Sequence, residues 1–181
     1  MKKYEFSIIA SGLDPQAEDF ETRFYNAGCD DATISFQKGH IIVDFTREAD
    51  SVDAAICSAV ECVEKAGAHV DRVEPDPLVN LSDIASRTGL TRAAISQYSK
   101  GQRSENFPSP VARVTSDTPL WDWATVATWF FRHQKLSRDE AIEAEAVKVA
   151  NEAIKAQEPR LRDALKGHLE AYEACLEKEA A

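Results

Sequence analysis

The side chains between residues 91 and 103 have the types and spacing needed to bind double-stranded DNA. Arg92 can donate two hydrogen bonds to a guanine edge, Gln97 can pair in the same way with adenine, and Ala93 can contact a thymine methyl group. Ser96 shares their face of a predicted helix. We therefore predict four base-contacting residues, which are Arg92, Ala93, Ser96 and Gln97.

Hydroxyl and cationic groups at the two ends of that helix are suited to the DNA backbone. Thr91 stands immediately before the helix, and Lys100 and Arg103 come just after it. Contacts to phosphates fix the position of a protein on the duplex without selecting a sequence. We predict phosphate contacts for all three residues. For each of these side chains, and for the four above, the alternative is an ordinary solvated surface residue.

Residues 82–100 have the pattern of two short helices joined by a tight turn. Ser82 is expected to cap the first helix and Thr91 the second, because their hydroxyls can accept from free N–H groups of a first helical turn. Gly89 stands where the turn needs a positive φ. The side chains expected to face the core are Ile84, Ala85, Leu90, Ile95 and Tyr98. The pattern is typical of a DNA-binding helix-turn-helix, and the alternative is a helical hairpin without a nucleic-acid role.

Charge is distributed unevenly along the chain. The 181 residues have a formal net charge of −10, yet residues 78–138 hold eight Lys or Arg against four acids, a net of +4. The flanking residues 1–77 and 139–181 have net charges of −9 and −5. An element that approaches phosphates needs positive charge, so this distribution favours the DNA-binding interpretation.

The residues after the two helices predict a β-hairpin and a third helix. Residues 111–115 alternate as a short strand, residues 116–119 have the composition of a turn, and Leu120–Trp121 is expected to return as the partner strand. Asp122 is expected to cap the third helix. A cluster of aromatic side chains is predicted to form a core rather than a stacking platform for bases, with Trp123 as its most exposed member. The cluster comprises Trp121, Trp123, Trp129, Phe130 and Phe131.

Three stretches together resemble a known family. Residues 95–101 (Ile-Ser-Gln-Tyr-Ser-Lys-Gly), 107–111 (Phe-Pro-Ser-Pro-Val) and 120–129 (Leu-Trp-Asp-Trp-Ala-Thr-Val-Ala-Thr-Trp) look like the winged helix-turn-helix core of the MerR-like superfamily, nearest its AlpA/excisionase-type branch. The likeness covers about residues 79–133. It implies that the second helix binds in the major groove. It also implies that the wing contacts the backbone or the minor groove through Arg113, Thr115 and Ser116.

Residues 1–74 predict an α+β domain. Strands are expected at about residues 4–8, 33–36, 41–45 and 68–73, with a hairpin turn at Lys38–Gly39. Helices are expected from Asp14–Pro15 to Gly28 and from residue 50 or 51 to Gly67. The order βαββαβ is that of a ferredoxin-like sandwich, a fold that hosts many functions. We expect this domain to sense a small-molecule effector, to join subunits or to dock a protein partner. The acidic pair Asp30–Asp31 near Asp44 is interpreted as an exposed turn rather than a cation site.

The remaining segments are a linker and a helical extension. Residues 75–80 are a predicted linker because they contain two prolines, residues 81–136 the predicted winged helix-turn-helix domain, and residues 137–181 the predicted C-terminal helices. Ser137 and Glu140 form a capping box, and Pro159 separates two helices with wide apolar stripes. The stripes comprise Ile142, Ala146, Val149, Ala153 and Ala156, then Leu161, Leu165, Leu169, Tyr172 and Leu176. They either fold back on the chain or pair across a homodimer, and the family resemblance favours the dimer.

Several classes of function find no support in the sequence. No run approaches the roughly 20 apolar residues of a membrane span, and the first residues lack a secretory signal, so we expect a cytoplasmic protein without membrane contact. The cysteines Cys29, Cys57, Cys62 and Cys175 show no metal-ligand spacing and are expected to be buried, reduced thiols, with redox sensing as the alternative. No phosphate-binding loop, dinucleotide fingerprint or nucleophile motif is found, so we expect no enzyme, no cofactor and no metal.

The leading hypothesis is a transcriptional regulator that binds double-stranded DNA sequence-specifically, as a dimeric repressor. Three alternatives stay open. The first is an antitoxin-like interaction protein whose acidic regions bind a partner, and the second is an excisionase-like factor that bends DNA. The third is a regulator that senses a small ligand.

Overall fold

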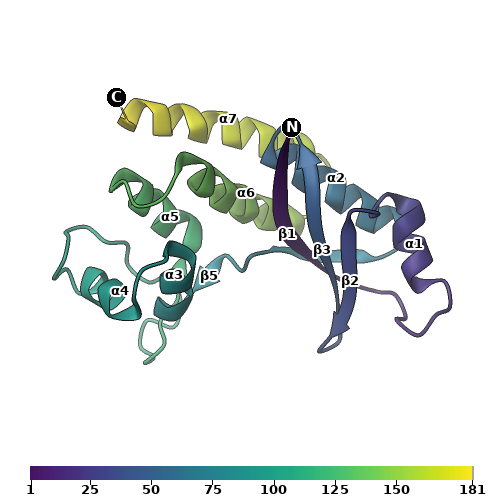
Figure 1. Ribbon diagram of the computed structural model, residues 1–181, viewed down its shortest axis with the longest axis horizontal. Helices are drawn as coiled ribbons and strands as arrows, with labels where there is room; N and C mark the ends of the chain where they lie inside the picture. Colours follow the sequence, from purple (N-terminus) through teal and green to yellow (C-terminus); the bar gives the residue numbers. More distant parts are fainter. Residues whose placement is uncertain (181) are drawn as a thin grey trace. The chain divides into compact units, whose positions relative to one another are not determined.

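The computed structural model describes residues 1–180, with side chains for residues 1–178 (Figure 1). The chain divides into two compact units. Unit 1 comprises residues 1–75 and 149–170, and unit 2 comprises residues 76–148 together with the end of the chain from residue 171. The C-terminal helices α6 (Arg138–Lys155) and α7 (Leu161–Ala180) therefore contribute to both units instead of forming a separate domain.

Unit 1 is a mixed α+β structure built on a four-stranded antiparallel sheet. The strands are β1 (Lys2–Ser11), β2 (Ala32–Gln37), β3 (His40–Ala49) and β4 (His69–Glu74), in the order β2-β3-β1-β4. Helices α1 (Phe20–Ala27) and α2 (Val52–Lys65) lie beside these strands (Figure 1).

Alternation of apolar and polar residues fixes which face of the sheet is buried. Along β3, Ile41, Val43 and Phe45 are buried and their neighbours are more exposed, because successive side chains of a strand point to opposite faces. Arg47 continues the same series and is buried as well. The buried residues of α2 that complete this core include Ile56, Ala59, Val60 and Val63.

Two turns in unit 1 follow the sequence prediction, and one helix start does not. Lys38 and Gly39 adopt positive φ angles of 51° and 83° between β2 and β3, as a two-residue hairpin requires. Gly28, with φ 99°, ends α1 as predicted. However, α1 begins at Phe20 and not at Asp14, because the Asp14 carboxylate accepts from Gln16 N–H at 2.9 Å and holds a turn there.

One side chain of α6 covers the edge of the sheet in unit 1. The Asn151 amide donates to the Val73 carbonyl at 2.9 Å, and its oxygen accepts from Val73 N–H at 2.8 Å. Strand β4 is an edge strand, so these are backbone groups that no neighbouring strand pairs. The pair of bonds fixes the end of α6 against β4.

Unit 2 contains β5 (Leu78–Val79), α3 (Leu81–Thr88), α4 (Arg92–Ser99), β6 (Trp121–Asp122), α5 (Trp123–Arg132) and the first part of α6. Its core includes Val79, Ile84, Ile95, Tyr98, Trp121, Val126, Trp129 and Phe130. The predicted linker is only partly a linker, because Leu78 and Val79 pair with β6 and Val79 is fully buried. Hydrophobic burial of Val79 outweighs the influence of the prolines before it.

The predicted hairpin after α4 is reduced to a single bridge. Ala112 pairs with Leu120, whose N–H donates to the Ala112 carbonyl at 2.9 Å. Trp121, expected to extend that pairing, instead pairs with Val79 of β5. Arg113 adopts a φ of 52°, which is not an extended conformation, so residues 113–119 form a loop rather than a strand.

The C-terminal helices begin as predicted and bury their stripes within the chain. Ser137 N–H donates to Glu140 at 2.8 Å and Glu140 N–H donates to the Ser137 hydroxyl at 3.2 Å, which is the predicted capping box. The buried members of the stripes include Ile142, Ala146, Val149, Leu165, Leu169 and Leu176. This burial within one chain agrees with the fold-back alternative, and pairing across a homodimer stays a prediction. None of the described helices is long and apolar enough to cross a membrane.

Candidate nucleic-acid interface

The N-terminus of α3 is fixed by a capping box at a different residue from the predicted one. The Asn80 side chain accepts from Asp83 N–H at 3.0 Å, and the Asp83 carboxylate accepts from Asn80 N–H at 2.9 Å. Ser82, the predicted cap, lies inside the first turn and is exposed. Asparagine is at least as good a cap as serine, and its position before Leu81 lets Leu81 pack against the core.

The turn between α3 and α4 has the geometry that the sequence predicts. Gly89 ends α3 with a φ of 67°, and Thr91 caps α4 through its hydroxyl oxygen, which accepts from Ala94 N–H at 3.1 Å. Thr88, at the end of α3, is a half-buried polar residue. Its hydroxyl donates to the Ile84 carbonyl at 2.8 Å, which satisfies the polar group inside the helix.

Helix α4 has one buried side and one exposed side. Ala94, Ile95 and Tyr98 are buried in the core of unit 2. The four predicted base-contacting residues lie outside that core, with Arg92, Ala93 and Gln97 exposed and Ser96 half-buried. The helix carries no acidic residue in its first turn. Its outer surface therefore presents a cation, an amide and small side chains together.

The predicted phosphate-contacting residues around α4 are also at the surface. Thr91, Lys100 and Arg103 are exposed. The Thr91 oxygen is used as the helix cap, so its hydroxyl proton is the group left to donate to a phosphate. The first backbone N–H groups of a helix have no partner within it and favour anions, which adds to the attraction at this end of α4.

An aromatic side chain positions the guanidinium of Arg103. The central carbon of that guanidinium lies 5.4 Å from the centre of the Tyr98 ring, within the range of a cation–π contact. Tyr98 is in turn held by Phe107, Trp129 and Phe130, whose ring centres are 6.2, 5.4 and 5.7 Å away. The loop after α4 is thus connected to the core at Tyr98 and Phe107.

The aromatic cluster forms the core of unit 2, as predicted, and does not offer a stacking platform. Trp121, Trp129 and Phe130 are buried. Trp123 was expected to be the exposed member, but it is only 8% exposed. The reason is Arg87 of α3, whose guanidinium carbon lies 5.2 Å from the centre of the Trp123 ring and covers it.

Several charged side chains of residues 78–138 are already engaged in ion pairs or hydrogen bonds within the chain. Among the acids, Asp83 is used in the α3 capping box and Asp122 accepts from Lys148 at 2.9 Å. Asp122 does not cap α5 with its side chain, as the sequence predicted, because it is used in this ion pair and by Thr125. Among the bases, Arg138 pairs with Glu173 at 2.9 Å and Glu177 at 3.1 Å. Arg138 therefore adds little positive charge to the α4 surface.

The predicted wing residues lie on the loop between the bridged residues 112 and 120. Arg113 and Thr115 are exposed, and Ser116 is half-buried, with its hydroxyl accepting from Thr118 N–H at 3.1 Å. Val111 and Val114 are 59% and 63% exposed. The loop carries one cation, Arg113, and one exposed acid, Asp117, so the α4 surface is the stronger part of the candidate interface.

Two features of the described residues were not predicted from the sequence. One is the role of Arg87, which also donates to the Asp76 carbonyl at 2.9 Å. The other lies in unit 1, where Cys29, Cys62 and the buried Arg47 meet. Cys29, Cys57 and Cys62 are buried as predicted, whereas Cys175 is exposed. No group of three His, Cys, Asp or Glu side chains within the described part of the chain is arranged to hold a metal ion.

Comparison with known proteins gives no match: no protein-family model, no curated protein and no solved structure resembles the chain significantly.

Proposed function

We propose that this chain binds double-stranded DNA sequence-specifically and that α4 is its recognition helix. The observation that carries the proposal is the two-sided character of α4. Arg92, Ala93 and Gln97 are exposed together, while Ile95 and Tyr98 fix the opposite side in the core. A rigid helix with donors on its outer surface suits the major groove, where base edges differ in their hydrogen-bonding groups.

The surroundings of α4 support the same proposal. Lys100 and Arg103 are exposed just beyond its C-terminus, and Thr91 begins it. Cations at this position can contact phosphates on either side of the groove that α4 enters. The proposal includes weaker backbone contacts by Arg113, Thr115 and Ser116, since they are accessible on the loop of residues 113–119.

The proposal extends to the architecture of both units. The antiparallel order β2-β3-β1-β4 with α1 and α2 supports a ferredoxin-like sandwich in unit 1. The elements α3, α4 and α5 with the bridge between Ala112 and Leu120 support a winged helix-turn-helix of MerR-like type with a short wing. Control of transcription by a repressing homodimer, and an effector or protein partner at unit 1, stay predictions.

Selection from a library of random DNA duplexes tests the proposal. The full chain is expected to enrich a short common sequence, and Arg92→Ala/Gln97→Ala should enrich none or a relaxed one. Lys166→Ala is the control, because Lys166 is exposed on α7 and forms only a long ion pair with Glu170. Enrichment of two half-sites about one helical turn apart would indicate two copies on the DNA.

The proposal is overturned if the DNA selected by the wild-type chain shows no sequence enrichment over the starting library. The same conclusion follows if the double variant and the wild type enrich the same sequence equally well. Circular dichroism of each variant checks that α4 and its neighbours are folded in either case.

A further inference from the structure

Two buried thiols in unit 1 lie close together although they are far apart in sequence. The sulfur atoms of Cys29 and Cys62 are 2.6 Å apart, and 33 positions separate the residues. Cys29 follows Gly28 at the end of α1, and Cys62 is on α2. A disulfide bond is about 2.05 Å long, so very little movement separates the two thiols from that bond.

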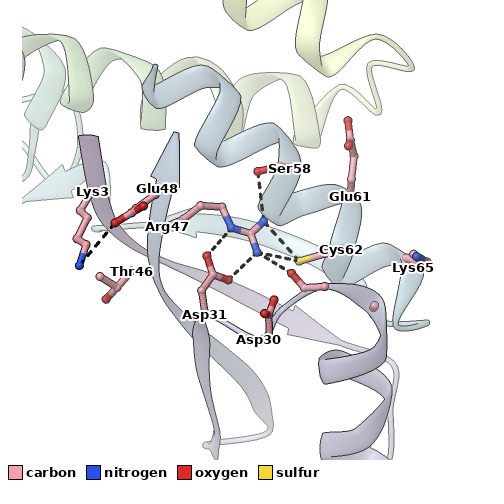
Figure 2. A pocket seen from close by; sticks show the side chains of 12 residues that line it. Lys3, Asp30, Asp31, Thr46, Arg47, Glu48, Ser58, Glu61, Cys62 and Lys65 are labelled. Carbon is pink, nitrogen blue, oxygen red and sulfur yellow. Dashed lines mark hydrogen bonds and ion pairs between the residues drawn. The ribbon is translucent and has the colours of Figure 1, made fainter. Parts of the chain in front are cut away.

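A fixed positive charge stands next to the sulfur of Cys62. Both terminal nitrogens of Arg47 lie 3.8 Å from it (Figure 2). The guanidinium is held by a two-pronged pair with Asp31, at 2.8 and 2.7 Å, and it also donates to the Gly28 carbonyl at 2.8 Å and to Ser58 at 3.2 Å. These bonds hold the guanidinium beside Cys62, where the nearby Asp31 carboxylate offsets part of its charge.

The two thiols have different chemical character. The hydrogen bond between the two sulfur atoms lowers the pKa of Cys62, and the charge of Arg47 adds to the lowering. The same hydrogen bond, together with burial, raises the pKa of Cys29. The guanidinium of Arg47, 3.8 Å from the Cys62 sulfur, therefore makes Cys62 the more readily deprotonated of the two thiols. A thiolate is the nucleophilic form of cysteine.

Cys62 is only 6% exposed, but it is one of the residues that line a cavity. Cys62 and Arg47 line a polar cavity of about 720 Å³ together with Ser58, Lys65 and Asp30. Figure 2 shows Ser58 and Asp30 near the guanidinium and Lys65 farther away, beyond Cys62. A small, uncharged, hydrogen-bonding oxidant fits such a cavity, and hydrogen peroxide has these properties.

We infer that Cys29 and Cys62 form a redox modification site at which hydrogen peroxide makes a reversible disulfide bond. The Cys62 thiol loses its proton to solvent, its sulfur attacks one peroxide oxygen, and the O–O bond breaks. The second oxygen leaves as water after taking up that proton. Cys62 is then a sulfenic acid. The Cys29 sulfur displaces its hydroxyl group, which leaves as a second water molecule with the remaining proton. Two thiols and one peroxide thus give one disulfide and two waters, and a thiol reductant reverses the change.

Thiol counting on the full chain tests this inference. The protein is reduced, freed of reductant and treated with an equimolar amount of hydrogen peroxide. We expect loss of two of the four thiols, a mass lower by two hydrogen atoms, and a linked peptide that contains Cys29 and Cys62. Retention of all four thiols, or a link between other cysteines, would overturn the inference.

Variants separate the two roles and supply a matched control. Cys29→Ser should stop at a sulfenic acid on Cys62 that dimedone traps, and Cys62→Ser should keep its remaining thiols. Cys57→Ser should behave as the wild type, because Cys57 lies on the same helix but burial raises its pKa to about 11. Loss of thiols from Cys62→Ser equal to that of the wild type would contradict the assignment of the attacking sulfur. Peptide mapping of the wild type tests the site even if a variant does not fold.

Discussion

The guanidinium of Arg103 lies over the ring of Tyr98, with its central carbon 5.4 Å from the ring centre. Tyr98 is buried and Arg103 is exposed, so the contact joins the core of unit 2 to the surface beyond α4. This relationship limits where the cation can lie in the unbound chain, and a cation that is already positioned loses less conformational entropy when it binds an anion.

We predict that Arg103→Ala weakens DNA binding more than Arg103→Lys does. Lysine keeps the charge but loses the planar group that lies over Tyr98, a contact worth about 0.5–1 kcal/mol at an exposed site. Fluorescence anisotropy with a labelled duplex measures both affinities. Equal affinities for the wild type and Arg103→Ala would show that Arg103 does not contact the phosphate backbone of the DNA.

Lys100→Ala is expected to weaken binding to all duplexes by the same factor. It should also reduce the slope of log K against log salt concentration by about one, because one fewer phosphate is neutralised. Arg138→Ala is the matched control, since Arg138 is paired with Glu173 and Glu177 and should leave the slope unchanged. If Arg138→Ala changes the salt slope and Lys100→Ala does not, the surface that contacts phosphates is not the one beside α4.

Thr91→Ala is expected to lower the free energy of unfolding by about 1 kcal/mol, because the hydroxyl oxygen no longer accepts from Ala94 N–H. Thr91→Ser keeps that oxygen and should lose much less. Urea unfolding followed by tryptophan fluorescence measures the difference, since Trp121, Trp123 and Trp129 lie in the same core. Equal losses for the two variants would mean that the cap adds nothing to stability.

Stability should fall at alkaline pH because of Cys57. Burial raises the pKa of this thiol from 9.0 to about 11, so the unfolded chain releases the proton at a lower pH than the folded chain does. The contribution is complete below pH 9 and is lost as the pH rises towards 11, in total on the order of 2 kcal/mol. Cys57→Ala removes this part of the pH dependence. Identical pH profiles of unfolding for the two proteins would contradict the prediction.

Local patterns were sufficient to predict most helices and strands. The sequence predicts a strand at residues 41–45, and Gly89 and Thr91 predict the turn and the cap of α4; all are as observed. These features depend on residues within one or two turns of each other. The exposed positions of Arg92, Ala93 and Gln97 follow from the same helical spacing.

Features that depend on distant residues could not be predicted in this way. Residues 111–115 were the predicted strand partner of Trp121. Trp121 instead pairs with Val79, which was assigned to the linker because of the two prolines before it. Cys29 meets Cys62 only because α1 and α2 pack together. One signal was present in the sequence: Arg47 continues the buried alternation of β3, and a charged residue in that position requires partners inside the unit.

The most direct test of the account compares the wild type with Arg92→Ala on the selected duplex and on its single-base-pair variants. Anisotropy titrations at fixed salt give the affinity for each duplex. If Arg92 on α4 contacts a base edge, the variant loses discrimination at one base pair by about 1–3 kcal/mol and keeps it at the others. If Arg92→Ala leaves both affinity and base preference unchanged, α4 is not the recognition helix.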